Sequence, residues 1–321
     1  MAEKKIIAVL GATGAQGGGL ARTILNDKKS EFKVRALTRD INSEKAKALA
    51  KSGAELKRAD IDNYESLKEA FAGVYGVYAV TFFWEHFSAE KEIAEAKLIA
   101  QAAKENNVRH LIWSTLEDTR KWLPVTDKRM PTLQGKYNVP HFDAKGESNK
   151  FFIKSGVPVT IMNTSFYWDN FFRYGLSKGD DGKIKLILPM GDKRLPGIAS
   201  EDIGKCAYSI FKKGKEFIGK TIGIAGGLLT GMQMAKSFSK ILGEEVDYVS
   251  PSFDDYRNSG LPAADERGNM FQFKHDFEKE YCGARDLELT RKLNPELKDF
   301  DTWLKINIKH IPIAEPHTVN Q

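Results

Sequence analysis

The chain has 321 residues, of which 41% are hydrophobic and 29% are charged, a composition typical of one large globular unit or two closely packed lobes. The first apolar stretch begins at Ile6, leaving no room for a signal peptide, and the longest, 74–84, is too short to cross a bilayer. Only Cys206 and Cys282 occur, and their spacing indicates neither a disulfide framework nor a metal site. We expect a cytoplasmic protein that does not bind a membrane, with entry into the nucleus left open.

The formal net charge is +6, which raises the question of nucleic-acid binding. The basic residues are scattered in pairs such as Lys28-Lys29 and Lys212-Lys213 instead of forming one block. This pattern favours a solvated surface, with anionic small ligands as the alternative. We expect no direct contact with nucleic acid.

The first half of the chain alternates between short apolar runs and helical patterns. We expect strands at 6–10, 33–38, 54–59, 74–81, 110–114 and 158–162, and helices at about 16–26, 43–52, 64–72, 88–107 and 141–155. Strict alternation of this kind predicts right-handed βαβ crossovers. The expected fold class is therefore α/β, with a doubly wound parallel Rossmann sheet.

The second half is less regular. It offers a hairpin-like stretch at 183–189, helical patterns near 201–213, 231–242 and 265–280, and a terminal helix around 299–309. We expect a Rossmann domain of residues 1–163 and a smaller C-terminal α+β lobe of residues 164–321. The boundary is not sharp, and segments after residue 163 can return to the first domain. The long connection 116–140 has no clear period, which is typical of a functional or mobile segment.

The run Gly11-Ala12-Thr13-Gly14-Ala15-Gln16-Gly17 directly follows the first expected strand and opens the first expected helix. Glycines let the backbone turn tightly and approach a pyrophosphate, while free N–H groups at the helix start receive its negative charge. Spaced glycines alone also occur in structural turns. The strand, loop and helix context favours a dinucleotide-binding loop in which Gly11, Thr13, Gly14, Gln16 and Gly17 contact the cofactor.

The end of the second expected strand distinguishes the two nicotinamide cofactors. NAD-binding proteins carry an acidic residue there, whereas this chain carries Arg39, which can form two charge-assisted hydrogen bonds to a 2′-phosphate. An ordinary surface Arg39 paired with Asp40 is the alternative. We predict that residues 1–163 bind NADP(H). Asp60 and Ile61 close the third strand where an adenine edge is expected, although Asp60 could instead cap a helix.

Three polar residues mark the place where chemistry is expected. Ser114 ends the fifth strand, and His141 and Lys145 lie four apart, on one face of the expected helix. An imidazole can do acid–base work near neutral pH. A plain surface pair of His141 and Lys145 would give the same sequence.

Longer segments carry a family resemblance: 11–18, Val34–Arg39, Trp84-Glu85, 141–147, 167–170, 268–271 and 286–295. Together they resemble the NmrA-like family of atypical short-chain dehydrogenases, and within it the HSCARG-type NADP(H) sensor proteins. Ordinary short-chain dehydrogenases have a tyrosine where this chain has His141. The resemblance therefore leaves open whether the chain is an enzyme.

The resemblance implies roles for individual residues. Thr13, Gln16 and Arg39 match phosphate contacts, Lys97 matches a lysine that points into the cofactor cleft, Lys145 matches a lysine near the nicotinamide ribose, and Thr81, Ser165 and Phe166 complete the cofactor contacts. Lys97 also lies on a stripe of small residues in the expected helix, where a side chain that extends into solvent is the alternative.

The resemblance also implies a function. It predicts a redox sensor whose binding to a regulatory protein partner depends on NADP(H), without direct contact to DNA. The alternative is an NADPH-dependent reductase of a quinone or another small carbonyl substrate. His141 in place of tyrosine favours sensing, whereas Ser114 and Lys145 leave a reductase open, and a homodimer is compatible with both.

Overall fold

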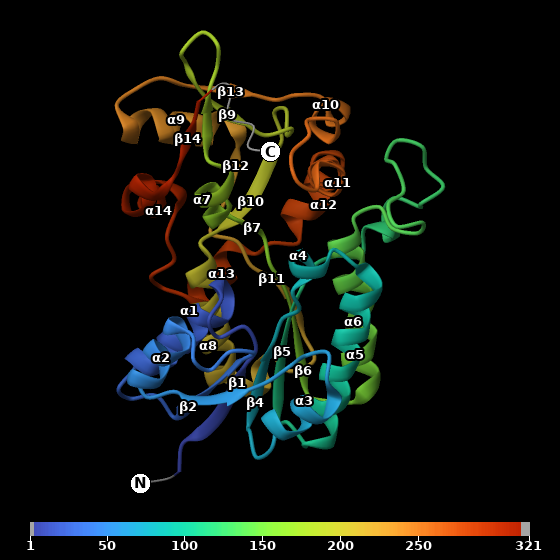
Figure 1. The fold of residues 1–321 in the computed structure, drawn as a ribbon, viewed down its shortest axis with the longest axis vertical. Coiled ribbons are helices and arrows are strands. Elements are labelled where there is room, and N and C mark those ends of the chain that lie inside the picture. The colour runs from blue at the N-terminus through green and yellow to red at the C-terminus, as the bar shows by residue number, and fades with distance from the viewer. Residues whose placement is uncertain (1–2, 316–321) are drawn as a thin grey trace.

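The computed structural model describes residues 3–315. A large parallel sheet with helices on both faces forms one body, and a smaller lobe stands above the carboxyl ends of its strands (Figure 1). No helix within residues 3–315 is long and apolar enough to span a bilayer.

The large sheet has seven strands in the order β11-β6-β5-β4-β1-β2-β3, and every neighbouring pair is parallel. The strands are β1 (Lys5–Val9), β2 (Phe32–Thr38), β3 (Glu55–Arg58), β4 (Gly76–Ala79), β5 (His110–Thr115), β6 (Val159–Asn163) and β11 (Thr221–Gly223). The expected doubly wound Rossmann sheet is thus confirmed. Its order reverses between β1 and β4, and ligands of such sheets bind at the carboxyl ends beside this reversal.

Helices cover both faces of the sheet. They are α1 (Ala15–Asn26), α2 (Glu44–Lys51), α3 (Tyr64–Ala70), α5 (Ala89–Glu105), α6 (Pro140–Ser155) and α8 (Ser200–Lys213). In Figure 1, α3, α5 and α6 lie to one side of the sheet, while α1, α2 and α8 lie to the other. The five helices expected in the first half all form.

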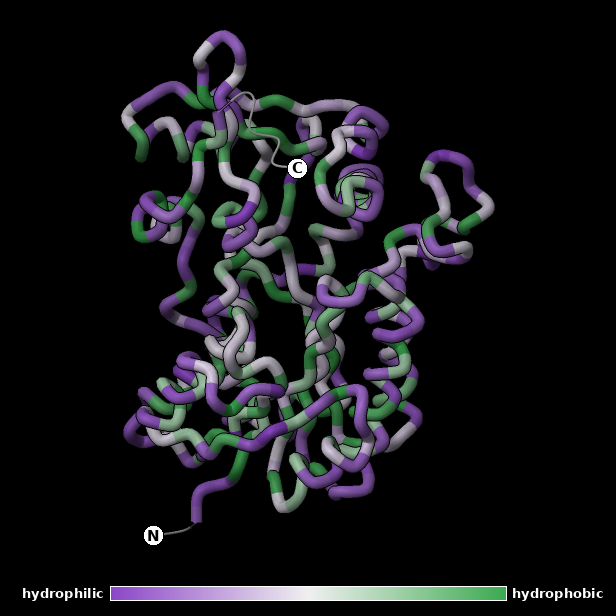
Figure 2. The backbone as a smooth tube through the Cα atoms, viewed as in Figure 1, coloured by the Kyte–Doolittle hydropathy of each residue, from purple (hydrophilic) through white to green (hydrophobic). Residues whose placement is uncertain are grey.

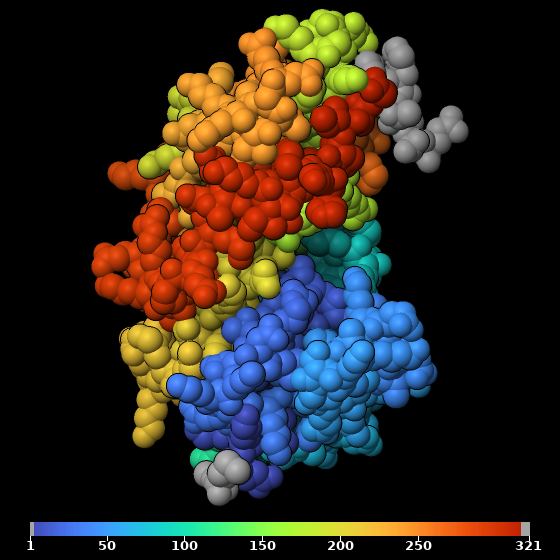
Figure 3. Space-filling model, turned by 90° about the vertical axis from the view of Figure 1, so that its left-hand side faces the viewer, coloured from blue at the N-terminus to red at the C-terminus, as the bar shows by residue number. Residues whose placement is uncertain are grey.

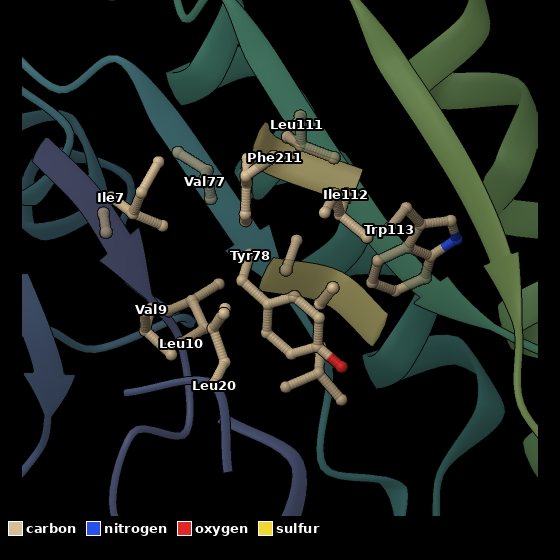
Figure 4. Packing of buried hydrophobic residues seen from close by; sticks show 14 of the residues in the cluster. Ile7, Val9, Leu10, Leu20, Val77, Tyr78, Leu111, Ile112, Trp113 and Phe211 are labelled. Carbon is tan, nitrogen blue, oxygen red and sulfur yellow. The ribbon is translucent and has the colours of Figure 1, made fainter. Parts of the chain in front are cut away.

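The core of this body lies between the central strands and the helices. Ile7, Val77, Leu111 and Ile112 are fully buried, and Figure 4 shows them packed with Leu20 of α1 and Phe211 of α8. Figure 2 shows the same strands as hydrophobic stretches inside a hydrophilic outer layer. Strands buried on both faces are expected to be continuously apolar, which is why their positions could be predicted.

The chain returns to the large sheet after residue 163. α8 packs against α1, and a Cβ atom added at Gly204 would lie 2.1 Å from the backbone nitrogen of Leu20, so only glycine permits this approach. β11 then pairs with β6 at the edge of the sheet. Residues 164–321 therefore supply elements to both bodies. Figure 3 shows the yellow segment around α8 beside the blue N-terminal elements.

The smaller lobe contains two short sheets and several helices. One sheet joins β12 (Gly227–Thr230), β10 (Arg194–Ile198) and β7 (Phe166–Tyr167); the other joins β13 (Val246–Val249), β9 (Ile184–Ile187), β8 (Leu176–Lys178) and β14 (Ile313–Ala314). The helices are α7 (Phe171–Tyr174), α9 (Gly231–Leu242), α10 (Phe253–Arg257), α11 (Ala264–Asp276), α12 (Glu278–Gly283) and α14 (Phe300–Asn307). α13 (Leu287–Leu293) packs against α8 of the large body. The expected α+β lobe is confirmed.

Two local expectations are wrong. The hairpin expected at 183–189 is the single strand β9, whose antiparallel partner β8 lies earlier in the chain. The helix expected at 265–280 is two helices, because the backbone leaves the helical conformation at Phe277 (φ −113°, ψ 34°) between α11 and α12. The break at Phe277 has no Gly or Pro signal, whereas Gly179 and Gly182 mark the turn between β8 and β9.

The connection 116–140 is mostly irregular and projects beside α6 (Figure 1). It is nevertheless attached to α11. The Asn269 side chain donates hydrogen bonds to the carbonyls of Pro131 and Asn138, and Gln272 donates to the carbonyl of Arg129. The segment therefore links the two bodies.

Candidate cofactor and substrate site

Two adjoining cavities open at the carboxyl ends of the large sheet. The first, of about 510 Å³, lies between the loop after β1 and the ends of β2 and β3. The second, of about 610 Å³, lies between the sheet and the smaller lobe. Both are lined by Gly11, Gly14, Phe82 and Glu85, so the glycine loop lies between them.

The glycine loop has the geometry of an anion cradle. Gly11 has a φ of +63°, and a Cβ atom at Gly17 would lie 2.5 Å from the carbonyl oxygen of Gly11. α1 begins directly after Gly14, and no side chain caps its first N–H groups. Because these groups lack an internal acceptor, they are available to a phosphate. The loop thus fits the pyrophosphate of a dinucleotide.

Arg39 lies at the mouth of the first cavity, with Ser43 and Lys45 nearby. Its side chain is 68% exposed, and its guanidinium forms two contacts with the carboxylate of Glu85, Nη1–Oε2 at 2.8 Å and Nη2–Oε1 at 2.9 Å. Asp40 is not its partner, since that carboxylate accepts from the backbone N–H of Asn42. An exposed pair of this kind contributes about 0–1 kcal/mol, so a phosphate could displace Glu85.

Asp60 and Ile61 line the opposite wall of the first cavity, next to Thr13 and Gly14. Asp60 does not cap the following helix. The N-cap of α3 is Asn63, whose side chain accepts from the backbone N–H of Ser66. The Asp60 carboxylate instead accepts from the N–H of Asp62, which orders the turn beside the cavity.

Gln16 connects the loop to the ends of two central strands. Its side-chain oxygen accepts from the hydroxyls of Tyr78 and Ser114, each at 2.6 Å, and its amide nitrogen donates to the Tyr167 hydroxyl. Ser114 is 2% exposed and does not line either cavity. The sequence placed Ser114 with His141 and Lys145, but the structure pairs it with Gln16.

Lys145 reaches the second cavity but is held by the protein. Its ammonium donates to Thr81 Oγ1 at 2.7 Å, to the Thr81 carbonyl at 3.2 Å and to Glu92 Oε1 at 2.7 Å. Thr81 also donates to Glu92 Oε1 at 2.6 Å. The Glu92 side chain is fully buried, so Lys145 supplies the charge that this carboxylate requires.

His141 lines the second cavity, beside Trp84, at a ring-centroid distance of 4.8 Å. Its Nδ1 contacts Glu266 of α11, and its backbone N–H donates to the same carboxyl oxygen at 2.9 Å. Burial lowers the pKa of His141 to about 3 and raises the pKa of Glu266 to about 8. Burial thus favours the neutral form of each group, and the two contacts with Glu266 hold the His141 ring in place.

The second cavity is walled by aromatic rings from both bodies. Trp84, Phe142, Phe166, Tyr167, Phe171, Tyr174, Tyr256, Phe271 and Tyr281 line it, together with Ser165, whose hydroxyl donates to the Ile224 carbonyl at 2.6 Å. A cavity with mostly apolar walls and few polar groups suits a small organic ligand.

Lys97 is a wrong prediction. It is exposed on α5 and lines neither cavity, whereas Lys91 and Glu95 of the same helix line the first. The α5 face that meets the cavity is therefore offset from the small-residue stripe. Burial raises the pKa of Glu95 to about 8.

Sequence reasoning missed Glu266 and Lys274, which both lie on α11. This helix buries residues around most of its circumference, so no polar face set these two side chains apart. The available signal was a lysine inside the run Met270-Phe271-Gln272-Phe273-Lys274. A lysine among aromatic residues in a helix without an amphipathic pattern indicates a buried cation.

Comparison with known proteins identifies the family. The family model described as NmrA-like matches residues 3–304. The NmrA-like family domain-containing oxidoreductase malD of Malbranchea aurantiaca is 30% identical over 259 residues, which cover 77% of this chain and 75% of that protein. The structure of Nmra, a negative transcriptional regulator, in complex with NAD superposes with a TM-score of 0.77 at 22% identity, covering 95% of both chains.

Other solved structures share this fold. Nmra in complex with NADP has a TM-score of 0.76 at 22% identity, again over 95% of both chains. The NADPH-dependent quinone oxidoreductase QOR2 of Escherichia coli, complexed with NADPH, has a TM-score of 0.68 at 20% identity, covering 90% of this chain and 99% of that chain. From the family model and the relative at 30% identity, the chain belongs to the NmrA-like family.

Proposed function

We propose that the chain binds NADP(H) along the first cavity and the glycine loop and reduces a flat aromatic substrate, such as a quinone, held in the second cavity. The observation that carries this proposal is the continuity of the two cavities at Gly11 and Gly14. A dinucleotide whose pyrophosphate lies on this loop extends its adenosine end into one cavity and its nicotinamide end toward the other.

The choice of NADP rests on the groups at the end of β2. Arg39 and Lys45 provide donors there, and Asp40 is engaged by its own backbone turn. This set favours a phosphate over free ribose hydroxyls. Similar structures bind both NAD and NADP, so the preference requires measurement.

The choice of substrate rests on the cavity walls and on what His141 cannot do. Reduction of a simple ketone requires a donor positioned like the tyrosine of ordinary short-chain dehydrogenases, and neutral His141 does not provide it. A quinone accepts a hydride readily because the product anion is aromatic, and its flat ring matches a cavity lined by aromatic side chains. Relatives named as oxidoreductases and the quinone oxidoreductase of similar fold support this class.

Steady-state oxidation of NADPH by 1,4-naphthoquinone tests the proposal. We expect turnover with NADPH, weaker turnover with NADH, and none with simple alcohols and NADP⁺. Ile187 lines the second cavity, so Ile187→Trp should block it, whereas Ile153→Trp on the exposed surface of α6 is the matched control. Turnover that is equal in both variants would place the substrate elsewhere, and no turnover in the unmodified protein would refute the reductase.

A sensor of the HSCARG type is the second candidate. Arg39 pairs with Glu85, and the neighbouring Trp84 lines the second cavity while remaining 41% exposed. A 2′-phosphate that takes Arg39 from Glu85 would free α4 (Phe83–His86), and such a difference between bound and free states is what a sensor requires. NADP(H) occupancy would then control a surface to which a regulatory protein partner, or a second copy of the chain, binds.

Hydrogen exchange of residues 83–87 tests the sensor. We expect exchange to change when NADPH binds and to change less with NADH, because NADH lacks the phosphate. Glu85→Gln should show the bound-like exchange without cofactor. Identical exchange in all these states would refute the switch.

A further inference from the structure

Lys274 is a buried ammonium group without a polar partner. It lies on α11 with 2% of its surface exposed, and none of the hydrogen bonds or ion pairs among residues 3–315 involves it. Its Nζ atom lies 5.4–5.8 Å from the ring centroids of Phe142, Phe166, Phe271 and Tyr281. Because Lys274 also lines the second cavity, its ammonium is in reach of whatever occupies that cavity.

Such a group is unfavourable for folding. Burial of an ammonium without a hydrogen-bonding partner is costly, and ring contacts return only part of that cost. Burial, with the positive charge of Arg285, lowers the pKa of Lys274 to about 7. The amine therefore exchanges a proton in the physiological range, and costly groups of this kind cluster at functional sites.

The charged groups around Lys274 are already occupied, whereas the Tyr281 hydroxyl has no hydrogen-bond partner among the described residues. Glu117 faces it but forms a double contact with the guanidinium of Arg285, which also donates to the Thr164 carbonyl at 2.6 Å. On α6, His141 is neutral and bound to Glu266. The rings of Phe142, Phe166, Phe271 and Tyr281 offer no carboxylate or carbonyl acceptor either. The N–H donors of the Lys274 ammonium therefore remain free.

Two nearby candidates for a proton donor are excluded by their own contacts. Lys145 has its donors engaged by Thr81 and Glu92, and Ser114 donates to Gln16 outside both cavities. Lys274 thus lines the cavity with free donors, and so does Tyr281, whose hydroxyl has no hydrogen-bond partner among the described residues. Burial raises the pKa of the Tyr281 hydroxyl and lowers the pKa of Lys274, so the ammonium is the stronger acid of the two.

We propose that Lys274 binds a carbonyl oxygen of the aromatic substrate and protonates that oxygen during reduction. This inference rests on the proposed reductase function and names its proton donor and its substrate class, a flat quinone. The surrounding rings would pack against the substrate ring while the ammonium fixes the position of its oxygen.

The reaction balances with NADPH as the reductant. A hydride carries two electrons and one hydrogen to the quinone and leaves the hydroquinone monoanion. The Lys274 ammonium transfers its proton to the anionic oxygen, the N–H bond breaks as the O–H bond forms, and the neutral amine then takes a proton from solvent. In sum, quinone, NADPH and one proton give hydroquinone and NADP⁺.

Lys274→Met tests the inference, because methionine preserves the length and the apolar stem of lysine while removing the amine. The matched control is Lys279→Met on the exposed surface of α12. We expect Lys274→Met to lower kcat for 1,4-naphthoquinone about a hundredfold, to weaken its binding about tenfold by tryptophan fluorescence quenching, and to leave calorimetric NADPH binding unchanged. Lys274→Arg should restore binding but not kcat, since a guanidinium does not release its proton.

The outcomes separate this inference from the proposed function. Turnover and quinone binding that are unchanged in Lys274→Met would overturn the role of Lys274 and leave the reductase intact. Loss of quinone binding in Lys274→Met, together with no turnover in the unmodified protein, would support Lys274 as the oxygen-binding residue and overturn the reductase. An unmodified protein that neither binds nor reduces the quinone would overturn both.

Discussion

Replacing Lys274 with methionine should stabilise the protein, by an amount that depends on pH. The pKa of Lys274 is lowered from 10.5 in the unfolded chain to about 7, first by burial and then by Arg285. At about 1.4 kcal/mol for each pH unit, this difference corresponds to an order of 4–5 kcal/mol of lost folding free energy while the amine is charged in both states.

The direction with pH follows from proton binding. Between about pH 7 and about pH 10.5 the unfolded chain binds a proton at Lys274 that the folded protein does not. The free energy of unfolding of the unmodified protein therefore rises with pH in this range, relative to that of Lys274→Met. The gain from the substitution is therefore largest below about pH 7 and shrinks as the pH approaches 10.5. Glu117, Arg285, His141 and Tyr281 face Lys274 in both proteins, so their own titration largely cancels in the difference.

Urea unfolding followed by circular dichroism measures this difference at the two ends of the range. Lys279→Met, on the exposed surface, should differ from the unmodified protein by less than about 0.5 kcal/mol throughout. If Lys274→Met destabilises the protein, or if its gain is constant across the range, then the ammonium has a partner in the folded state. Either result would remove the physical basis for its role.

Three further predictions concern the cofactor loop and the neighbouring imidazole. Arg39→Ala should weaken NADPH binding roughly ten- to hundredfold and leave NADH binding nearly unchanged in calorimetry; equal losses for both would show that Arg39 only supports the fold. Gly17→Ala should abolish binding of both cofactors and lower the melting temperature, because its Cβ would lie 2.5 Å from the Gly11 carbonyl oxygen, and normal binding would contradict the cradle. His141→Gln should change naphthoquinone turnover by less than about tenfold, since neutral His141 is bound to Glu266; a hundredfold loss would restore His141 as the proton donor.

The sequence predicted the large sheet well because its signals are local. Strands buried on both faces are continuous apolar runs, and the glycine loop directly follows the first strand and opens a helix whose first N–H groups have no side-chain cap. β11 has only three residues and is specified by its pairing with β6, which no local pattern reveals. The packing of α8 against α1 likewise depends on a contact between Gly19 and Gly204, two residues that are distant in the chain.

The candidate site was predicted in part. Gly11, Thr13, Gly14, Arg39, Asp60 and Ile61 line the first cavity, and Gln16, Gly17, Thr81, His141, Lys145, Ser165 and Phe166 line the second. Their part in cofactor binding stays a prediction. The sequence did not reveal the interactions that decide the chemistry, which are the contact of His141 with Glu266 and the free amine of Lys274. Both come from α11, which only the tertiary fold brings to the carboxyl ends of the strands.

The pairing of Arg39 with Glu85 was also hidden in the sequence. The two residues are brought together because the loop after β4 passes the end of β2, and helical or strand periodicity carries no information about that passage. The prediction that Lys97 points into the cofactor cleft was wrong for a related reason. Its small-residue stripe predicted a buried face correctly at Ala96 and Ala100, but the lysine itself points outward.

Single-turnover reduction tests the central claim most directly. Protein saturated with NADPH is mixed rapidly with 1,4-naphthoquinone, and the reduced-nicotinamide absorbance and the hydroquinone are followed together. The account predicts loss of the absorbance with one hydroquinone formed per NADPH oxidised, and a much slower reaction in Lys274→Met. Stable absorbance while both ligands are bound would contradict the account.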